Sequence, residues 1–103
     1  MSEPMDIATF ERKAGEVSNL LKGIANGRRL MVLCKLAERG EMKVGDLAAE
    51  VGLSQSALSQ HLAKMRQEML VDFRRDGQTL WYRLADPRIQ ALLDTLYRLY
   101  CND

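Results

Sequence analysis

The chain has 103 residues, of which 47% are hydrophobic and 28% are charged, and its formal net charge is +1. These values are typical of one small folded domain and exclude a disordered chain. No segment is apolar for long enough to span a bilayer, and the polar N-terminal stretch MSEPMDIATFERK is unlike a secretory signal. We therefore expect a single cytoplasmic domain over residues 1–103.

Two amphipathic helices are predicted first. Residues 6–24 carry apolar side chains three or four positions apart, at Ile7, Phe10, Ala14, Val17, Leu21 and Ile24. Asn26 and Gly27 interrupt this pattern, and Asn26 is a favourable N-cap for a second helix that Gly40 ends. The inner stripe of the second helix is formed by Leu30, Leu33, Cys34 and Ala37.

A helix-turn-helix is predicted over residues 44–69. A short helix at 44–51 leads into the sequence VGLS, in which Gly52 permits a bend, Leu53 turns inward and Ser54 caps a longer helix. We expect the inward face of the longer helix to carry Leu58, Leu62, Met65 and Met69.

The outward face of the longer helix is polar and nearly uncharged. It carries Ser56, Ser59, Gln60, Ala63 and Gln67, with Gln55 near the first turn. A merely solvated helix usually carries Glu and Lys pairs four residues apart, whereas short or forked hydrogen-bonding side chains suit the base edges of a DNA major groove. We therefore interpret this face as a DNA-reading surface, and the free N–H groups at Ser54 favour a phosphate.

A β-hairpin is predicted over residues 70–84, where two alternating runs flank Asp76-Gly77. With these two residues as the loop, three facing pairs are expected: Arg75 with Gln78, Phe73 with Leu80, and Val71 with Tyr82. The apolar members of these pairs, Val71, Phe73, Leu80 and Tyr82, then share the core face of the hairpin.

Asp86-Pro87 is typical of a helix start, and a last helix is expected over residues 87–101. Its apolar positions are Ile89, Leu92, Leu93, Leu96, Leu99 and Tyr100. The predicted order is α-α-α-α-β-β-α, a mainly α fold with a small β-hairpin, and it is typical of a winged helix-turn-helix. The wide apolar faces of the first and last helices predict burial against a second copy, because so short a chain buries only a modest core.

Basic residues flank the hairpin tip. Arg74 and Arg75 precede the predicted loop and can reach phosphates or the minor groove, although Asp72 and Asp76 dilute the charge and an ordinary surface hairpin is the alternative. His61 is the only histidine, and we expect either a structural side chain or a phosphate contact there. The predicted DNA contacts are Ser54, Gln55, Ser56, Ser59, Gln60, His61, Arg66, Arg74, Arg75 and Gln78.

Residues 44–84, VGDLAAEVGLSQSALSQHLAKMRQEMLVDFRRDGQTLWYRL, resemble the ArsR/SmtB family of winged-helix transcription regulators, and LSQSALSQHLAKMR is a specific match. The resemblance covers nearly the whole chain. It implies a homodimer formed through the helices at 6–24 and 87–101 that binds imperfect inverted repeats in double-stranded promoter DNA. Family members usually have glycine where this chain has Met69, and we expect this departure to alter the helix end or the wing angle.

The family's metal sites have no match in this sequence. They use a Cys-x-Cys near the start of the third helix, or Asp/His/Glu clusters on the last helix. Here the corresponding KVGDL lacks cysteine and the last helix lacks histidine. We therefore expect no metal and no cofactor.

Cys34 and Cys101, in VLCKL and LYCND, are similar in position to the cysteines of the thiol- and persulfide-responsive HlyU/BigR subgroup. The resemblance implies that reactive sulfur species or oxidants join them by a disulfide or polysulfide bridge, which changes DNA binding. Two buried structural cysteines are the alternative. The apolar stripe around Cys34 predicts a raised pKa, and a helix C-terminus disfavours a thiolate at Cys101 unless Arg98 offsets it.

Three other functions are alternatives for this sequence. A DNA-binding regulator without thiol sensing, which activates by displacing another DNA-bound silencer, stays open. A thiol enzyme would need a base beside a cysteine, and none is evident, so we expect no catalytic residue and no enzyme. A winged-helix module for protein partners would carry an apolar or acidic face at residues 55–60, which this chain does not.

Overall fold

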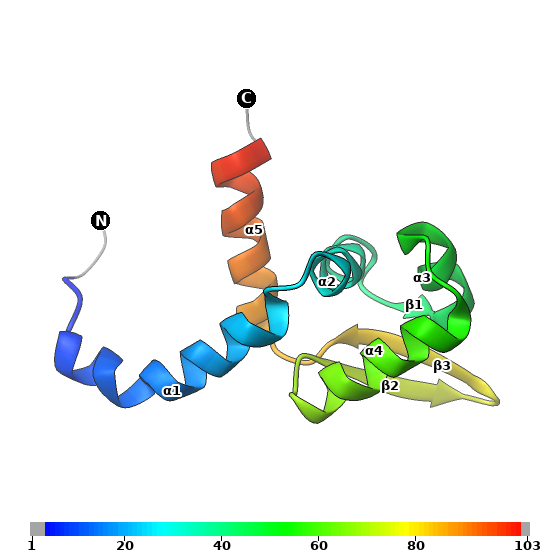
Figure 1. Ribbon diagram of the computed structural model, residues 1–103, viewed down its shortest axis with the longest axis horizontal. Helices are drawn as coiled ribbons and strands as arrows, with labels where there is room; N and C mark the ends of the chain where they lie inside the picture. The colour runs from blue at the N-terminus through cyan, green and yellow to red at the C-terminus, as the bar shows by residue number, and fades with distance from the viewer. Residues whose placement is uncertain (1–3, 102–103) are drawn as a thin grey trace.

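The computed structural model of the protein describes residues 4–101, so residues 1–3 and 102–103 of the expected domain lie outside the described residues. Within residues 4–101, five helices accompany one small sheet of three strands (Figure 1). In chain order they are α1 (Ile7–Ile24), α2 (Gly27–Arg39), β1 (Met42–Lys43), α3 (Val44–Val51), α4 (Gln55–Gln67), β2 (Val71–Asp76), β3 (Thr79–Leu84) and α5 (Pro87–Cys101). The expected winged helix-turn-helix is confirmed.

Side-chain caps fix where the helices begin. The Asn26 carboxamide accepts the backbone N–H groups of Arg28 and Arg29 at 3.0 and 3.2 Å, and the Ser54 hydroxyl accepts that of Ala57 at 3.1 Å. Asp86 accepts the N–H of Arg88 at 2.8 Å at the start of α5. All three predicted caps are confirmed, and each satisfies a donor that the first helical turn leaves free.

The core lies between α2, α3, α4 and the sheet. α4 contributes Leu58, Leu62 and Met65, and Leu70 follows immediately after that helix. The prediction that Met69 also points inward is wrong, because its side chain is 76% exposed. The fully buried set is completed by Val32, Leu33, Leu36, Leu47, Val71 and Ile89.

α4 ends in the motif that glycine usually forms. Met69 has a φ of 63°, its N–H donates to Arg66 O at 3.0 Å, and the N–H of Leu70 donates to Met65 O at 2.9 Å. These two bonds define a Schellman motif with Met69 at the left-handed position. The expectation that Met69 alters the helix end is therefore wrong, since the backbone takes the left-handed conformation despite the Cβ.

The sheet differs from the prediction in register and in size. Asp76 pairs with Thr79 and Phe73 with Tyr82, so the two-residue loop is Gly77-Gln78 and not Asp76-Gly77. Gly77 has a φ of 62°, and a glycine at the first loop position suits a type II′ turn. The shift of two along β3 preserves the core face. A further strand, β1, was not predicted and pairs with β3, which gives the order β1-β3-β2.

α1 and α5 project from the body of the protein, away from the hairpin tip (Figure 1). Ile24 closes the core, but the other end of α1 leaves Ile7 and Phe10 exposed. In the last turns of α5, Leu99 is 71% exposed and Tyr100 is 82% exposed. Two apolar faces therefore stay uncovered in one copy of the chain.

Candidate nucleic-acid interface and cysteine pair

The outward face of α4 is as polar and as accessible as its sequence predicts. α4 lies alongside the hairpin (Figure 1), and its buried residues Leu58, Leu62 and Met65 share the face opposite to the polar one. His61 is half-buried, which agrees with its place at the border of the apolar stripe. The exposed residues are Gln55, Ser56, Ser59, Gln60, Ala63 and Gln67.

The turn between α3 and α4 holds this face in place. Gly52 takes a left-handed φ of 71°, and the N–H of Leu53 donates to Ala48 O at 3.0 Å. The Gln55 amide packs over α3, because a Cβ added at Gly45 would lie 3.4 Å from its Nε2 atom. These contacts join α3 and α4 through the turn and through Gln55, and α4 presents its small polar side chains on the outward face.

Arg66 does not extend from α4 into solvent. Its guanidinium lies 4.2 Å from the centre of the Phe73 ring, and its Nε is 3.6 Å from the Asp72 carboxylate. The side chain remains about half exposed. Arg66 thus connects the end of α4 to the base of the wing. Its half-exposed guanidinium lies between α4 and β2.

Arg74 is held by a partner that the sequence analysis missed. Its Nε donates to both carboxylate oxygens of Glu41, at 3.0 and 2.9 Å, and Arg83 lies 3.6 Å from the same carboxylate. The hydrogen bond from Arg74 is the main reason that the pKa of Glu41 lies below its ordinary value. Glu41 is 33 residues away in sequence, and only the unpredicted strand β1 brings it alongside the sheet.

Arg75 and Gln78 remain exposed near the hairpin tip. Within residues 4–101, Arg75 forms no ion pair, in contrast to Arg74. The alternation of a strand places these two arginines on opposite faces of the sheet, and Arg75 is on the face that packs against α4. The tip residue that accompanies the polar face of α4 is therefore Arg75.

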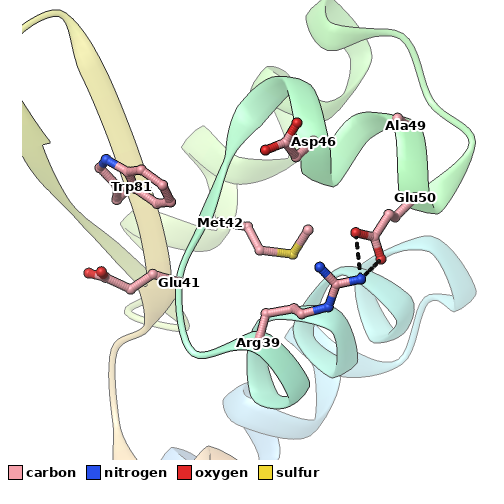
Figure 2. A pocket seen from close by; sticks show the side chains of 7 residues that line it. All are labelled: Arg39, Glu41, Met42, Asp46, Ala49, Glu50 and Trp81. Atoms are coloured by element: carbon pink, nitrogen blue, oxygen red, sulfur yellow. Dashed lines mark hydrogen bonds and ion pairs between the residues drawn. The ribbon is translucent and has the colours of Figure 1, made fainter.

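A shallow pocket lies on the other side of the sheet, between α2, α3 and β1. It has a volume of about 420 Å³, and Figure 2 shows Arg39 turned across it toward Glu50, at 2.9 Å. Glu41, Asp46 and Glu50 line it, so carboxylates outnumber the single arginine. A nucleic-acid phosphate is disfavoured there by the excess of negative charge.

α2 packs against α5, and these two helices carry Cys34 and Cys101. Both are free thiols; Cys34 is half-buried and Cys101 is exposed. Burial first, and the nearby Cys101 second, raise the pKa of Cys34, as the apolar stripe predicts. Arg98 donates to the Thr95 hydroxyl at 3.3 Å, one turn before, so its guanidinium is directed away from the helix end.

Neither a metal site nor a membrane-spanning helix is present in residues 4–101, the part of the chain that the structure describes. No group of three or more His, Cys, Asp or Glu side chains in that range is arranged to hold a metal ion. No helix in that range has the length and apolar character needed to cross a membrane.

Comparison with known proteins gives a consistent result. The family model described as "Bacterial regulatory protein, arsR family" matches residues 26–72. The transcriptional activator HlyU of Vibrio cholerae is 44% identical over 99 residues, which cover 96% of this chain and 91% of that protein.

Solved structures agree. The transcriptional repressor BigR from Xylella fastidiosa superposes with a TM-score of 0.87 at 37% identity, covering 96% of this chain and 100% of that chain. A homodimeric winged helix-turn-helix DNA-binding domain from Mycobacterium bovis, a possible ArsR-family regulator, superposes with a TM-score of 0.77 at 29% identity. It covers 96% of this chain and 89% of that one.

Proposed function

This chain belongs to the ArsR family of bacterial regulatory proteins, and we propose from that membership that it reads inverted repeats in promoters as a homodimer switched by its two cysteines. The family and its relatives are transcriptional regulators, so the chain is a DNA-binding regulator and not an enzyme. A regulator of bacterial promoters acts on DNA, which supports a cytoplasmic location.

The polar face of α4 is the observation that carries the proposal. Its serine and glutamine side chains are exposed, neutral and short enough to enter a major groove, where glutamine pairs bidentately with adenine. The helix N-terminus at Ser54 meets a phosphate, and His61 and Arg66 lie beside the backbone. At the wing, Arg75 and Gln78 contact the backbone or the minor groove, and Arg74 assists from the opposite face of the sheet.

The exposed apolar residues on α1 and α5 support a homodimer. Phe10, Leu99 and Tyr100 are exposed large apolar side chains on helices that project from the body. A second copy related by a two-fold axis covers them and repeats the α4 face on the other side. Two reading helices related in this way contact half-sites one DNA turn apart, about 34 Å.

The contact between α2 and α5, and the electrostatic effect of Cys101 on the pKa of Cys34, support the thiol switch. Cys101 is exposed and meets the reagent first, whereas the raised pKa of Cys34 suppresses its thiolate. The Cys101 thiolate attacks the terminal sulfur of an organic persulfide and releases the thiolate RS⁻. Cys34, once deprotonated, attacks the Cys101 sulfur and displaces HS⁻, so the persulfide is the oxidant and a disulfide is the product.

A bridge between α2 and α5 joins the reading unit to a helix of the proposed dimer interface. Such a link alters the separation of the two α4 helices. A coupling of ~1–3 kcal/mol changes DNA affinity by roughly 5- to 150-fold. Because one relative is an activator and another a repressor, the direction of gene control follows from the promoter context.

A titration of promoter DNA with reduced and persulfide-treated protein tests the switch. We expect persulfide treatment to change the DNA affinity of the wild type. Cys34→Ser and Cys101→Ser should keep the DNA affinity of the untreated, thiol-reduced protein. A Cys34→Ser protein that responds as the wild type does contradicts the switch. Equal affinities of treated and reduced wild type favour the regulator that activates by displacing a silencer without sensing.

A further inference from the structure

The last turn of α1 lies against the end of α4, where the absence of a side chain at Gly23 leaves room for Leu70. A Cβ added at Gly23 would lie 2.7 Å from Leu70 Cδ1, and both residues are buried. Leu70 is the residue that closes the Schellman motif after α4. α1 is therefore packed directly on the turn that ends the reading helix.

Arg29 forms the polar part of the same contact. Its Nη1 donates to Gly23 O at 3.3 Å and to Glu68 Oε1 at 2.9 Å. Gly23 lies in the last turn of α1, Arg29 in the first turn of α2, and Glu68 caps the C-terminus of α4. One guanidinium thus bonds three helices, and we call Gly23, Arg29, Glu68 and Leu70 the α1–α4 joint.

Arg29 is more sheltered than the other cations that form ion pairs within residues 4–101. Its side chain is 13% exposed, and the next, Lys35, is 29% exposed. A sheltered ion pair adds little net stability, because desolvation offsets the attraction, but its geometry is restrictive. The planar, forked guanidinium of arginine restricts the geometry of the ion pair more than the ammonium of lysine would. We therefore expect the joint to affect the angle between α1 and α4 more than the free energy of unfolding.

We propose that Arg29 is a positioning residue that sets the angle between α1 and α4, and through α1 the separation of the two reading helices. This inference rests on the proposed function, since it requires a dimer that uses α1 and reads two half-sites. The guanidinium itself is turned inward onto Gly23 and Glu68, so its role is not a phosphate contact. Its loss changes which half-site spacing is preferred.

The test uses a set of duplexes that carry two copies of the half-site selected by the wild-type protein, separated by spacers that differ in single base-pair steps. Affinity is measured for the wild type, Arg29→Gln and Glu68→Ala. Arg39→Gln is the matched control, because Arg39 forms an ion pair of the same 2.9 Å length with Glu50, away from the joint. Sedimentation and thermal unfolding show that each variant is a folded dimer.

We expect the wild type to bind one spacer most tightly. In both joint variants, the ratio of the affinity for that spacer to the affinity for the others should fall by about fivefold or more. Arg39→Gln should keep the wild-type profile. Arg29→Gln and Glu68→Ala change the charge in opposite directions, so an effect of charge alone would weaken one and strengthen the other on all duplexes equally. The joint instead predicts the same flattened profile for both.

Two results would overturn the inference, and they are distinguishable. If the wild type prefers a spacer and both joint variants keep that preference, the positioning role is wrong while the proposed function stands. If the wild type selects no half-site or shows no preference among spacers, the proposed function falls and the inference falls with it. Should Arg29→Gln fail to fold, Glu68→Ala decides alone.

Discussion

Met69 holds a backbone conformation that costs a side chain with a Cβ about 1–2 kcal/mol. Its side chain is exposed and contributes little packing in return. The sequence pattern placed Met69 on the inward stripe of α4, because periodicity alone does not show that the helix stops at Gln67. The departure from the family's glycine was the better signal, since it marked the position whose φ is positive.

We expect Met69→Gly to raise the free energy of unfolding by about 0.5–1 kcal/mol, because the relieved strain exceeds the entropy that glycine adds to the unfolded chain. Met69→Ala keeps the Cβ and serves as the control, with little change. Urea denaturation measures both variants. A Met69→Gly protein no more stable than Met69→Ala would show that the left-handed position carries no strain.

Cys34 and Cys101 should differ in their rates of alkylation. The exposed Cys101 is expected to react first with iodoacetamide near neutral pH, because Cys34 is half-buried and its pKa is raised. The rate at Cys34 should rise as pH increases past the ordinary thiol pKa of about 8.5, where its thiolate begins to form. Mass spectrometry of timed samples measures both sites. Faster labelling of Cys34 at neutral pH would contradict the proposed order of attack.

At the scale of elements, local signals predicted the helices well and the sheet less well. Caps such as Asn26 and Ser54 act within a few residues and could be recognised in the sequence. β1 has only two residues and no alternating pattern of its own; its pairing with β3 defines it. Glu41, the partner of Arg74, follows that pairing and could not be found without it. The loop was misplaced by one residue because Asp76-Gly77 also satisfies a turn signal.

Ser54 has a structural role as the cap of α4 and a proposed role at a phosphate, and substitutions separate the two. Ser54→Ala should lower the free energy of unfolding by about 1 kcal/mol, whereas Ser54→Asp caps the helix equally well. The added charge of Ser54→Asp should nonetheless weaken DNA binding. Ser18→Asp adds the same charge on α1 as a control. Thermal unfolding and a DNA titration measure these effects, and unchanged DNA affinity in Ser54→Asp would remove Ser54 from the interface.

At the scale of the whole molecule, the sequence predicted that two helices need a partner, and the structure leaves their apolar faces uncovered. The apolar stripes of α1 and α5 could be predicted from the sequence, because their apolar residues keep helical spacing well beyond the part of each helix that the core covers. The joint between α1 and α4 could not be predicted. Arg29 and Glu68 are 39 residues apart, and nothing in the local pattern of either predicts their contact.

Leu99→Glu should convert the proposed dimer to a folded monomer, because it places a charge on the exposed apolar face in the last turn of α5. Leu99 is highly exposed in the single chain, so the fold itself should persist. Ala91→Glu adds the same charge on the polar side of α5 and should stay dimeric. Sedimentation gives the mass of each variant, and a Leu99→Glu protein that remains dimeric would place the interface elsewhere.

Selection from a random duplex pool tests most directly whether the polar face of α4, doubled in a dimer, reads base pairs. We predict that the wild type enriches an inverted repeat with half-site centres one helical turn apart, roughly 10 base pairs. A Ser59→Ala/Gln60→Ala protein should enrich half-sites with different bases at the same spacing. Failure of the wild type to enrich any sequence over competitor DNA, or identical bases selected by both proteins, would contradict the account.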